Sequence, residues 1–301
     1  MVERMLRVAL MAVVLSATSC AEPPARSDPS YATSPPPGTP RELVFGVHPL
    51  HNPRRLEVVF GPLIDELSRA TGRPFRLEAS RSYASFEDKL ARRAFDFALP
   101  NPYQTVQQRE HGYHVLAKQG DDVRFRGLLI ARKDDGPRAL ADVKGHSVAF
   151  PAPTALAAAM MPQLFLAQRA GLKPDRDYTA LYVGSQESSL MSVLRGEVVL
   201  GVTWPPPWDA FRREHPVEAA QLEVRWETPS LINNSVVARD DVPEALINQV
   251  RDALVALSTT EAGRAVLGRL DASTFEPADD ATYAPVEHLM DAYMREVGPL
   301  P

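Results

Sequence analysis

Two histidine pairs are the residues in this chain whose types and spacing could most directly do chemistry. His48 and His51, like His111 and His114, are three positions apart, a spacing at which two imidazoles could share a metal ion. No cysteine or acidic cluster accompanies either pair, so we expect no metal site. The sequence has no Gly-x-Ser-x-Gly motif, no glycine-rich phosphate loop and no visible Ser-His-Asp order, so we expect no catalytic residues and no cofactor. These observations favour binding over catalysis.

The elements that would position a binding site occur twice. Residues 43–112 and 146–214 follow one pattern, about 104 residues apart. Each copy reads as a strand, a helix ending near glycine, a strand, a serine-containing loop, a short helix, a strand and a proline-rich loop with aromatic residues. This alternation predicts mainly parallel sheets with helices on both faces. Two copies of one α/β unit predict two lobes with a cleft between them.

The first twenty residues have the features of an export signal. Arg4 and Arg7 precede an apolar run from Val8 to Leu15, which is too short to span a bilayer. Small residues then lead to Cys20, the only cysteine in the chain, whose position resembles the lipidated cysteine of bacterial lipoproteins. The alternative is an ordinary secretory signal with an incidental cysteine. In both cases we expect an exported protein, and with lipidation one held at the cell membrane or outer membrane, facing the periplasm.

The composition beyond the signal limits the structures and partners that are possible. Residues 21–40 hold seven prolines, a composition that cannot bury a core and predicts an extended tether. The formal net charge of −5 supplies no basic field that would recruit nucleic acid, so we expect no nucleic-acid partner.

Two extended segments bracket the second copy of the repeat. Residues 125–133 and 234–239 each contain Ala-Arg followed by acidic residues, and we interpret them as the strands that connect the lobes. The helical tail from Pro243 to Pro301 is expected to pack back on the first lobe. The expected division is signal peptide 1–19, lipidated cysteine and proline-rich tether 20–41, first lobe 42–132 with 236–301, and second lobe 133–235.

Five short motifs, individually weak, occur in a characteristic order and spacing: Phe45-Gly-Val47, Phe95-Asp-Phe-Ala98, Arg132-Lys133-Asp134, Ser185-Gln-Glu187 and Thr259-Thr-Glu-Ala-Gly263. With them the chain resembles the phosphonate- and phosphite-type substrate-binding proteins of ABC importers, in the type II periplasmic binding protein superfamily. The likeness covers nearly all of residues 42–275. It implies a two-lobed α/β fold, each lobe a mainly parallel sheet flanked by helices, which closes by hinge motion on a ligand in the cleft.

The resemblance also implies where a ligand would bind. The family holds its phosphorus oxyanion in a Ser/Thr-rich turn at a helix N-terminus, which corresponds here to the turn at Thr154. Tyr83 matches a family aromatic residue, and Gln186 stands where relatives have histidine. The acidic residues of relatives are replaced near Pro207 and Asn234. The expected ligand-binding residues are Tyr83, Asn101, Tyr103, Thr154, Ser185, Gln186, Trp204, Trp208 and Asn234.

Each of these residues also has a structural alternative. Asn101, Thr154 and Ser185 would serve equally as helix N-caps. The aromatic residues would serve as packing, and Asn234 as a turn residue at the hinge. Without the acidic residues of relatives, a cationic aminoalkyl phosphonate is disfavoured. Phosphite, an alkyl phosphonate, a sulfonate and an uncharged metabolite all remain open.

The function that these expectations favour is that of a lipid-anchored, extracytoplasmic solute-binding protein. It would capture a small oxyanion by lobe closure and deliver it to the permease and ATPase subunits of an ABC importer. One alternative is a sensor lipoprotein that presents its ligand-bound state to a membrane kinase. A less favoured alternative is an enzyme built on the same fold.

Overall fold

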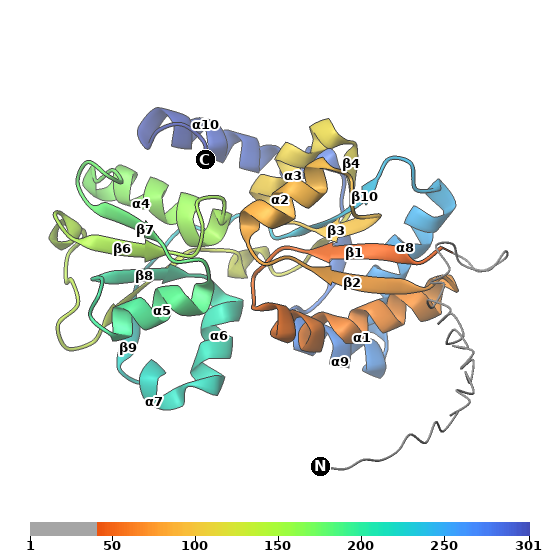
Figure 1. The fold of residues 1–301 in the computed structure, drawn as a ribbon, viewed down its shortest axis with the longest axis horizontal. Coiled ribbons are helices and arrows are strands. Elements are labelled where there is room, and N and C mark those ends of the chain that lie inside the picture. Colours follow the sequence, from red (N-terminus) through yellow and green to blue (C-terminus); the bar gives the residue numbers. More distant parts are fainter. Residues whose placement is uncertain (1–40) are drawn as a thin grey trace, which may run out of the picture. The chain divides into compact units, whose positions relative to one another are not determined.

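Two separate β-sheets organise the part of the chain that this computed structural model describes, residues 41–301 (Figure 1). The expected signal peptide, the lipidation site Cys20 and the tether up to residue 40 lie outside the described residues. The strands of the first sheet are β1 (Leu43–Val47), β2 (Phe75–Ala79), β3 (Phe97–Leu99), β4 (Tyr113–Gln119), β10 (Ser235–Arg239) and β11 (Phe275–Pro277). Those of the second are β5 (Leu128–Arg132), β6 (Ser147–Phe150), β7 (Thr179–Tyr182), β8 (Leu200–Thr203) and β9 (Leu222–Glu227).

The helices alternate with the strands along the chain. They are α1 (Pro53–Thr71), α2 (Tyr83–Ala91), α3 (Pro102–Gln107), α4 (Met161–Ala170), α5 (Gln186–Leu194), α6 (Pro205–Glu214), α7 (Pro216–Ala219), α8 (Glu244–Ala256), α9 (Glu261–Leu270) and α10 (Ala284–Glu296). Asn52 caps α1 through its side chain, and Gly72 ends this helix in the left-handed conformation. Asn101 caps α3, as its structural alternative predicts, and in both helices a proline directly follows the capping asparagine.

The internal repeat is present in the sheets. Strands β2–β1–β3 of the first sheet and β7–β6–β8 of the second form parallel triplets in the same order, with the first strand of each repeat in the middle. The predicted two-lobed α/β fold is therefore confirmed. The expectation that each sheet is mainly parallel was wrong, because both sheets are mixed. Strands β10, β4 and β11 extend the first triplet with antiparallel pairings, and β5 and β9 extend the second.

Side chains alternate between the two faces of each sheet. In β1, Phe45 faces the large core that contains the apolar side of α1, whereas Val44 packs with Phe86 of α2. In β6, Phe150 faces the same large core, and Ala149 packs with residues of α5 and α6. Each sheet is thus covered by helices on both faces, as a buried parallel triplet requires.

The chain crosses between the sheets twice, in segments that lie side by side. Residues 120–127 lead from β4 to β5, and residues 228–234 lead from β9 to β10. The Leu231 N–H donates to the Phe125 carbonyl at 2.9 Å, and the Asn233 side chain donates to the Gly120 carbonyl at 2.7 Å. The extended runs expected to connect the lobes are strands of the sheets, and the crossings lie just before them. The second sheet therefore begins at Leu128, a few residues before the expected lobe boundary.

The helical tail packs on both halves of the repeat. Helices α8 and α9 pack against α1, as expected for the first lobe. Helix α10 contacts α3 beside the first sheet and also α4 beside the second (Figure 1). The Tyr293 hydroxyl donates to Gln163 Oε1 of α4 at 2.5 Å, and Arg109 forms an ion pair of 2.5 Å with Glu287.

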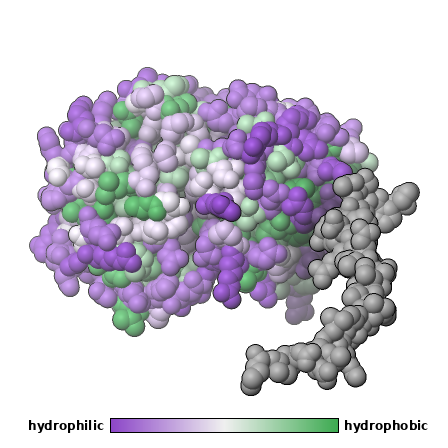
Figure 2. Space-filling model, viewed as in Figure 1, coloured by the Kyte–Doolittle hydropathy of each residue, from purple (hydrophilic) through white to green (hydrophobic). Residues whose placement is uncertain are grey.

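The surface of the described residues is predominantly polar. The face drawn in Figure 2 is largely hydrophilic, with apolar residues in small separate patches. Between residues 41 and 301, no helix is both long and apolar enough to cross a bilayer.

Candidate ligand-binding site

A small cavity lies where loops from the two sheets meet, and we call it the inner cavity. Its walls come from the ends of β1, β3, β6 and β8, the first turns of α2 and α5, and the two crossing segments. Loops that follow parallel strands are the usual ligand sites of α/β folds. The lining residues are His48, Tyr83, Asn101, Phe125, Ala155, Leu156, Ala157, Ala158, Gln186, Trp204 and Asn234.

The inner cavity is very small. Its volume of about 10 Å³ is close to the minimum needed for one water molecule. Five of the nine expected ligand-binding residues line it: Tyr83, Asn101, Gln186, Trp204 and Asn234. All five side chains are at most 5 % exposed, so a ligand held there would be shielded from solvent.

Hydrogen bonds join the two halves of the repeat across the inner cavity. Asn101 Nδ2 donates to the Thr154 carbonyl at 2.9 Å. Gln186 Nε2 donates to the Tyr83 hydroxyl at 3.4 Å, and Gln186 Oε1 accepts from the Thr203 hydroxyl at 2.9 Å. The polar groups of this region are therefore already oriented by one another.

The first residues of a helix form one wall of the inner cavity. Leu156–Met160 form a π-helical turn that runs directly into α4. The first N–H groups of a helix have no acceptor within it, and they favour an anion. The N-cap position is Ala155, and no side chain caps this helix, so the expected cap by Thr154 is absent. A ligand contact by the buried Thr154 side chain stays a prediction.

The remaining expected residues lie outside the inner cavity. The Tyr103 hydroxyl donates to the Pro301 carbonyl at 2.9 Å. Ser185 caps α5, accepting from the Ser188 N–H at 3.0 Å. Trp208 belongs to the core of the second sheet, where it stacks on Phe211 with ring centroids 6.0 Å apart. Ligand contacts by these residues remain predictions.

His48 is the cavity residue that sequence reasoning missed as a ligand contact. It directly follows β1 and is 2 % exposed, and its Nδ1 lies 2.9 Å from the Leu99 carbonyl. Burial lowers the pKa of His48 to about 4, so the ring is neutral at neutral pH. One feature of the sequence could have indicated this role. His48 directly follows the first strand of the first repeat, and the Pro151 turn holds the same position after β6 in the second repeat. Residues 41–301 contain no cluster of three potential metal-ligating side chains.

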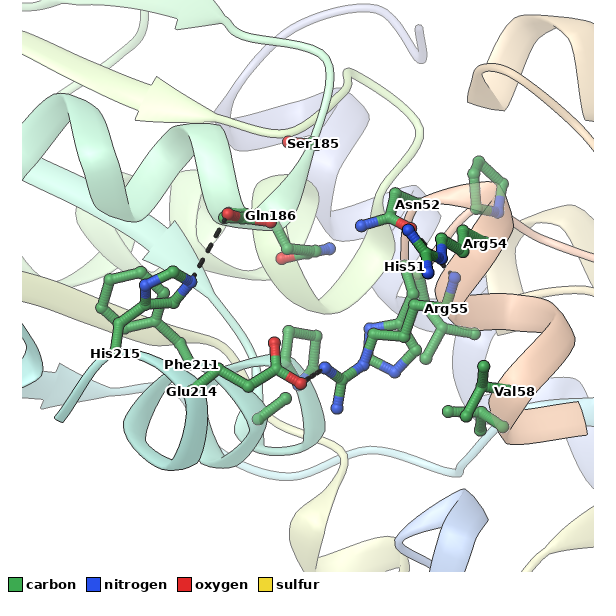
Figure 3. Close-up of a pocket in the computed structure, with 16 residues that line it drawn as sticks. His51, Asn52, Arg54, Arg55, Val58, Ser185, Gln186, Phe211, Glu214 and His215 are labelled. Carbon is green, nitrogen blue, oxygen red and sulfur yellow. Dashed lines mark hydrogen bonds and ion pairs between the residues drawn. The ribbon is translucent and has the colours of Figure 1, made fainter.

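A larger outer pocket of about 370 Å³ lies beside the inner cavity, between the N-terminal part of α1 and helices α5 and α6 (Figure 3). Gln186 lines both the inner cavity and the outer pocket, so it lies where the two adjoin. Arg55 of α1 and Glu214 of α6 point toward each other and form an ion pair. On the same side as Glu214, His215 Nε2 lies 3.7 Å from Glu187 Oε1. The outer pocket thus carries the formal charges that the inner cavity lacks.

A family model supplies the identification. The model described as "ABC transporter, phosphonate, periplasmic substrate-binding protein" matches residues 45–283. The chain belongs to this family. Members of the phosphonate substrate-binding family are components of transporters, and they bind the solute that the transporter carries.

Similar proteins agree with the family. The probable ABC transporter phosphite-binding protein PhnD1 of Prochlorococcus marinus (strain MIT 9301) is 21 % identical over 275 residues, covering 86 % of this chain and 92 % of PhnD1. The crystal structure of a binding protein component of an ABC phosphonate transporter from Pseudomonas aeruginosa superposes with a TM-score of 0.78 at 19 % identity, covering 86 % and 88 % of the two chains. The structure of PhnD1 in complex with methylphosphonate gives a TM-score of 0.75 at 18 % identity, covering 83 % and 97 %.

Proposed function

We propose that this protein is a lipid-anchored, extracytoplasmic receptor that captures a small phosphorus oxyanion by lobe closure and delivers it to an ABC importer. The permease and ATPase subunits of that importer would be its partners. Capture and release would require no chemical step, because the chain acts by binding alone.

The observation that carries the proposal is the construction of the inner cavity from both halves of the repeat. Asn101 and Tyr83 reach it from the first half, and the Thr154 turn and Gln186 from the second. A ligand placed between them contacts both halves only when they approach each other. Its binding energy therefore favours the closed arrangement.

The character of the cavity supports the choice of ligand. The N–H groups at the start of the Leu156 turn suit an anion. The cavity volume of about 10 Å³ is close to that of a single water molecule, so its walls must move apart to admit even a compact oxyanion. PhnD1, a relative of this chain, has been solved in complex with methylphosphonate. We therefore take methylphosphonate and phosphite as the first probes.

A thermal-shift and calorimetric titration of the purified protein tests the binding function. Methylphosphonate, phosphite, phosphate and sulfonates would be compared at equal concentrations. A ligand present at one hundred times its Kd stabilises the native state by about 2.7 kcal/mol, which raises the Tm of a chain of this size by roughly 5 °C or more. The absence of any shift or binding heat with phosphorus oxyanions would contradict the proposal.

The anchor is tested separately from the ligand. Cys20→Ser should remove the attachment point of the lipid and release the exported protein from the membrane fraction, because the buried acyl chains supply the anchoring energy. Fractionation followed by immunoblotting measures this. Ser19→Ala, beside the cysteine, is the matched control and should stay with the membrane. Retention of the Cys20→Ser variant would exclude the anchor and leave the binding function untouched.

A further inference from the structure

The inner cavity contains a buried hydrogen-bond acceptor that nothing in the described chain satisfies. Asn234 is 1 % exposed, and its Nδ2 donates to Gln119 Oε1 at 3.0 Å. Its Oδ1 has no hydrogen-bond partner among residues 41–301. Leaving a buried acceptor unpaired is unfavourable, so this oxygen indicates that a donor arrives with the ligand.

His48 presents a second acceptor to the same cavity. The Leu99 carbonyl can only accept, so Nδ1 of His48 carries the ring proton in their 2.9 Å contact. The neutral ring then has a lone pair on Nε2, and no described residue donates to it. Nε2 is therefore an acceptor for as long as the ring stays neutral.

The titratable groups around His48 leave its acceptor unchanged across the neutral range. Burial and nearby cationic groups hold the pKa of His51 at about 3. Burial raises the pKa of Tyr83, whose ring packs edge-on to His48 with centroids 6.2 Å apart. Phe86, the other aromatic neighbour, does not titrate. No described lining residue of the inner cavity is Asp, Glu, Lys or Arg.

Other lining residues of the cavity offer donors. The Tyr83 hydroxyl accepts from Gln186, so its own proton is free to donate. The backbone N–H groups that begin the Leu156 turn are further donors. The cavity therefore matches a ligand that both accepts and donates hydrogen bonds. The lack of a cationic side chain further favours a singly charged ligand over a doubly charged one.

Resting on the binding function proposed above, we infer that the cavity selects a singly protonated phosphorus oxyanion, whose O–H is accepted by Asn234 Oδ1 or His48 Nε2. The same two acceptors exclude sulfonates of equal shape. A phosphoryl group keeps one proton below its second pKa, which is about 6 in phosphate esters, so the singly protonated form is available in mildly acidic to neutral solution. A sulfonate has no such proton and would place its oxygen lone pairs against both acceptors.

The test compares methylphosphonate with methanesulfonate by calorimetry on the exported protein, because these ligands share shape and substituent. The wild-type protein should bind methylphosphonate at least about 10- to 100-fold more tightly, the range expected for one hydrogen bond to a charged group. Its affinity for methylphosphonate should fall about tenfold per pH unit above the second pKa of the ligand.

Variants identify the acceptor. His48→Phe or Asn234→Leu, whichever removes the acceptor of the ligand proton, should cut the preference for methylphosphonate about 10-fold or more. His114→Phe is the matched control, because His114 is exposed and pairs with Asp280 away from the cavity. The control should keep the full preference, and circular dichroism should verify that each variant is folded.

The outcomes separate this inference from the binding function. Equal or tighter binding of methanesulfonate by the wild-type protein would overturn the inference and leave a solute-binding function in place. A preference that survives in folded forms of both cavity variants would also overturn it. Binding of neither ligand would overturn the inference together with the proposed oxyanion function.

Discussion

Neutral hydrogen-bonding groups, rather than charged side chains, line the inner cavity. Gln186 shows how they are held, because Thr203 fixes its carbonyl oxygen and leaves the amide N–H to reach Tyr83. Such prior orientation reduces the entropy that a ligand must lose on binding. At this scale the selectivity of the site depends on which groups donate and which accept.

Tryptophan fluorescence should report ligand binding through one residue. Trp204 lines the inner cavity and packs edge-on against Phe125, with ring centroids 5.4 Å apart, whereas Trp208 is stacked in the core of the second sheet. A bound ligand should change the emission of Trp204 by replacing its surroundings. When the Trp204→Phe variant is titrated with ligand, most of the ligand-dependent change in fluorescence should be absent. The matched variant Trp208→Phe should keep this change. A signal that persists in Trp204→Phe would contradict this assignment.

Single residues were predictable where their role is local. Asn101 and Ser185 carry the features of helix N-caps in the sequence, and both cap a helix. The placement of His48 was not predictable, because its acceptor Leu99 is 51 residues away and adjacent only through the β1–β3 pairing. In the sequence, the spacing of His48 and His51 suggested a possible metal-binding pair. In the fold, the ring of His48 is instead oriented by its contact with the Leu99 carbonyl.

At the scale of elements, the outer pocket is bridged by an ion pair between α1 and α6. Removing the pair with Arg55→Gln should speed ligand release about 2- to 5-fold, because a partly exposed pair contributes less than about 1 kcal/mol. Stopped-flow dissociation measures this rate, and added salt should reduce the effect. The double reversal Arg55→Glu with Glu214→Arg should restore slow release.

A control on the same helix checks that the effect is local. Arg69 is exposed and pairs with Glu66 three residues earlier on α1, away from the outer pocket. Arg69→Gln should leave the dissociation rate unchanged. Equal acceleration by Arg69→Gln and Arg55→Gln would show that general charge, and not the bridge, sets the rate.

The helices and parallel strands were predictable from local signals, but the pairing of the added antiparallel strands was not. Asn52 and Gly72 mark the ends of α1 in the sequence, and the structure has both. The pairing of β10 with β3 and β4 joins segments more than 100 residues apart in the chain. Such long-range pairing depends on where the crossing segments place the strand and on distant partners, such as Asp96, which pairs with Arg239 at 2.9 Å.

At the scale of the whole molecule, stability should decrease in mild acid. The pKa of His48 is about 4 in the folded chain against an ordinary value of 6.5. Below pH 6.5 the unfolded chain takes up a proton that the folded chain does not, so the free energy of unfolding falls as the pH drops toward 4. The complete shift corresponds to about 3 kcal/mol. His51, whose pKa is lowered to about 3, adds in the same direction.

Urea denaturation at a series of pH values measures this effect. The slope of unfolding free energy against pH should be shallower in His48→Phe than in the wild-type protein. His114→Phe, at an exposed position, should retain the wild-type slope. Equal slopes for the wild-type and His48→Phe proteins would show that His48 does not carry the acid sensitivity.

Helix α10 offers a place where ligand affinity can be changed without altering the residues of the inner cavity. It is tied to α4 by the Tyr293–Gln163 bond and by Gln168 Nε2, which donates to Glu296 Oε1 at 3.1 Å, and to the first half of the repeat by Arg109–Glu287. Under the proposed closure, any separation of the halves must break or slide one of these ties. The strength of the ties then sets the fraction of molecules ready to bind, and the measured affinity scales with that fraction. Substitutions along α10 would therefore tune the working concentration range of a solute biosensor built on this chain, without altering which solute it recognises.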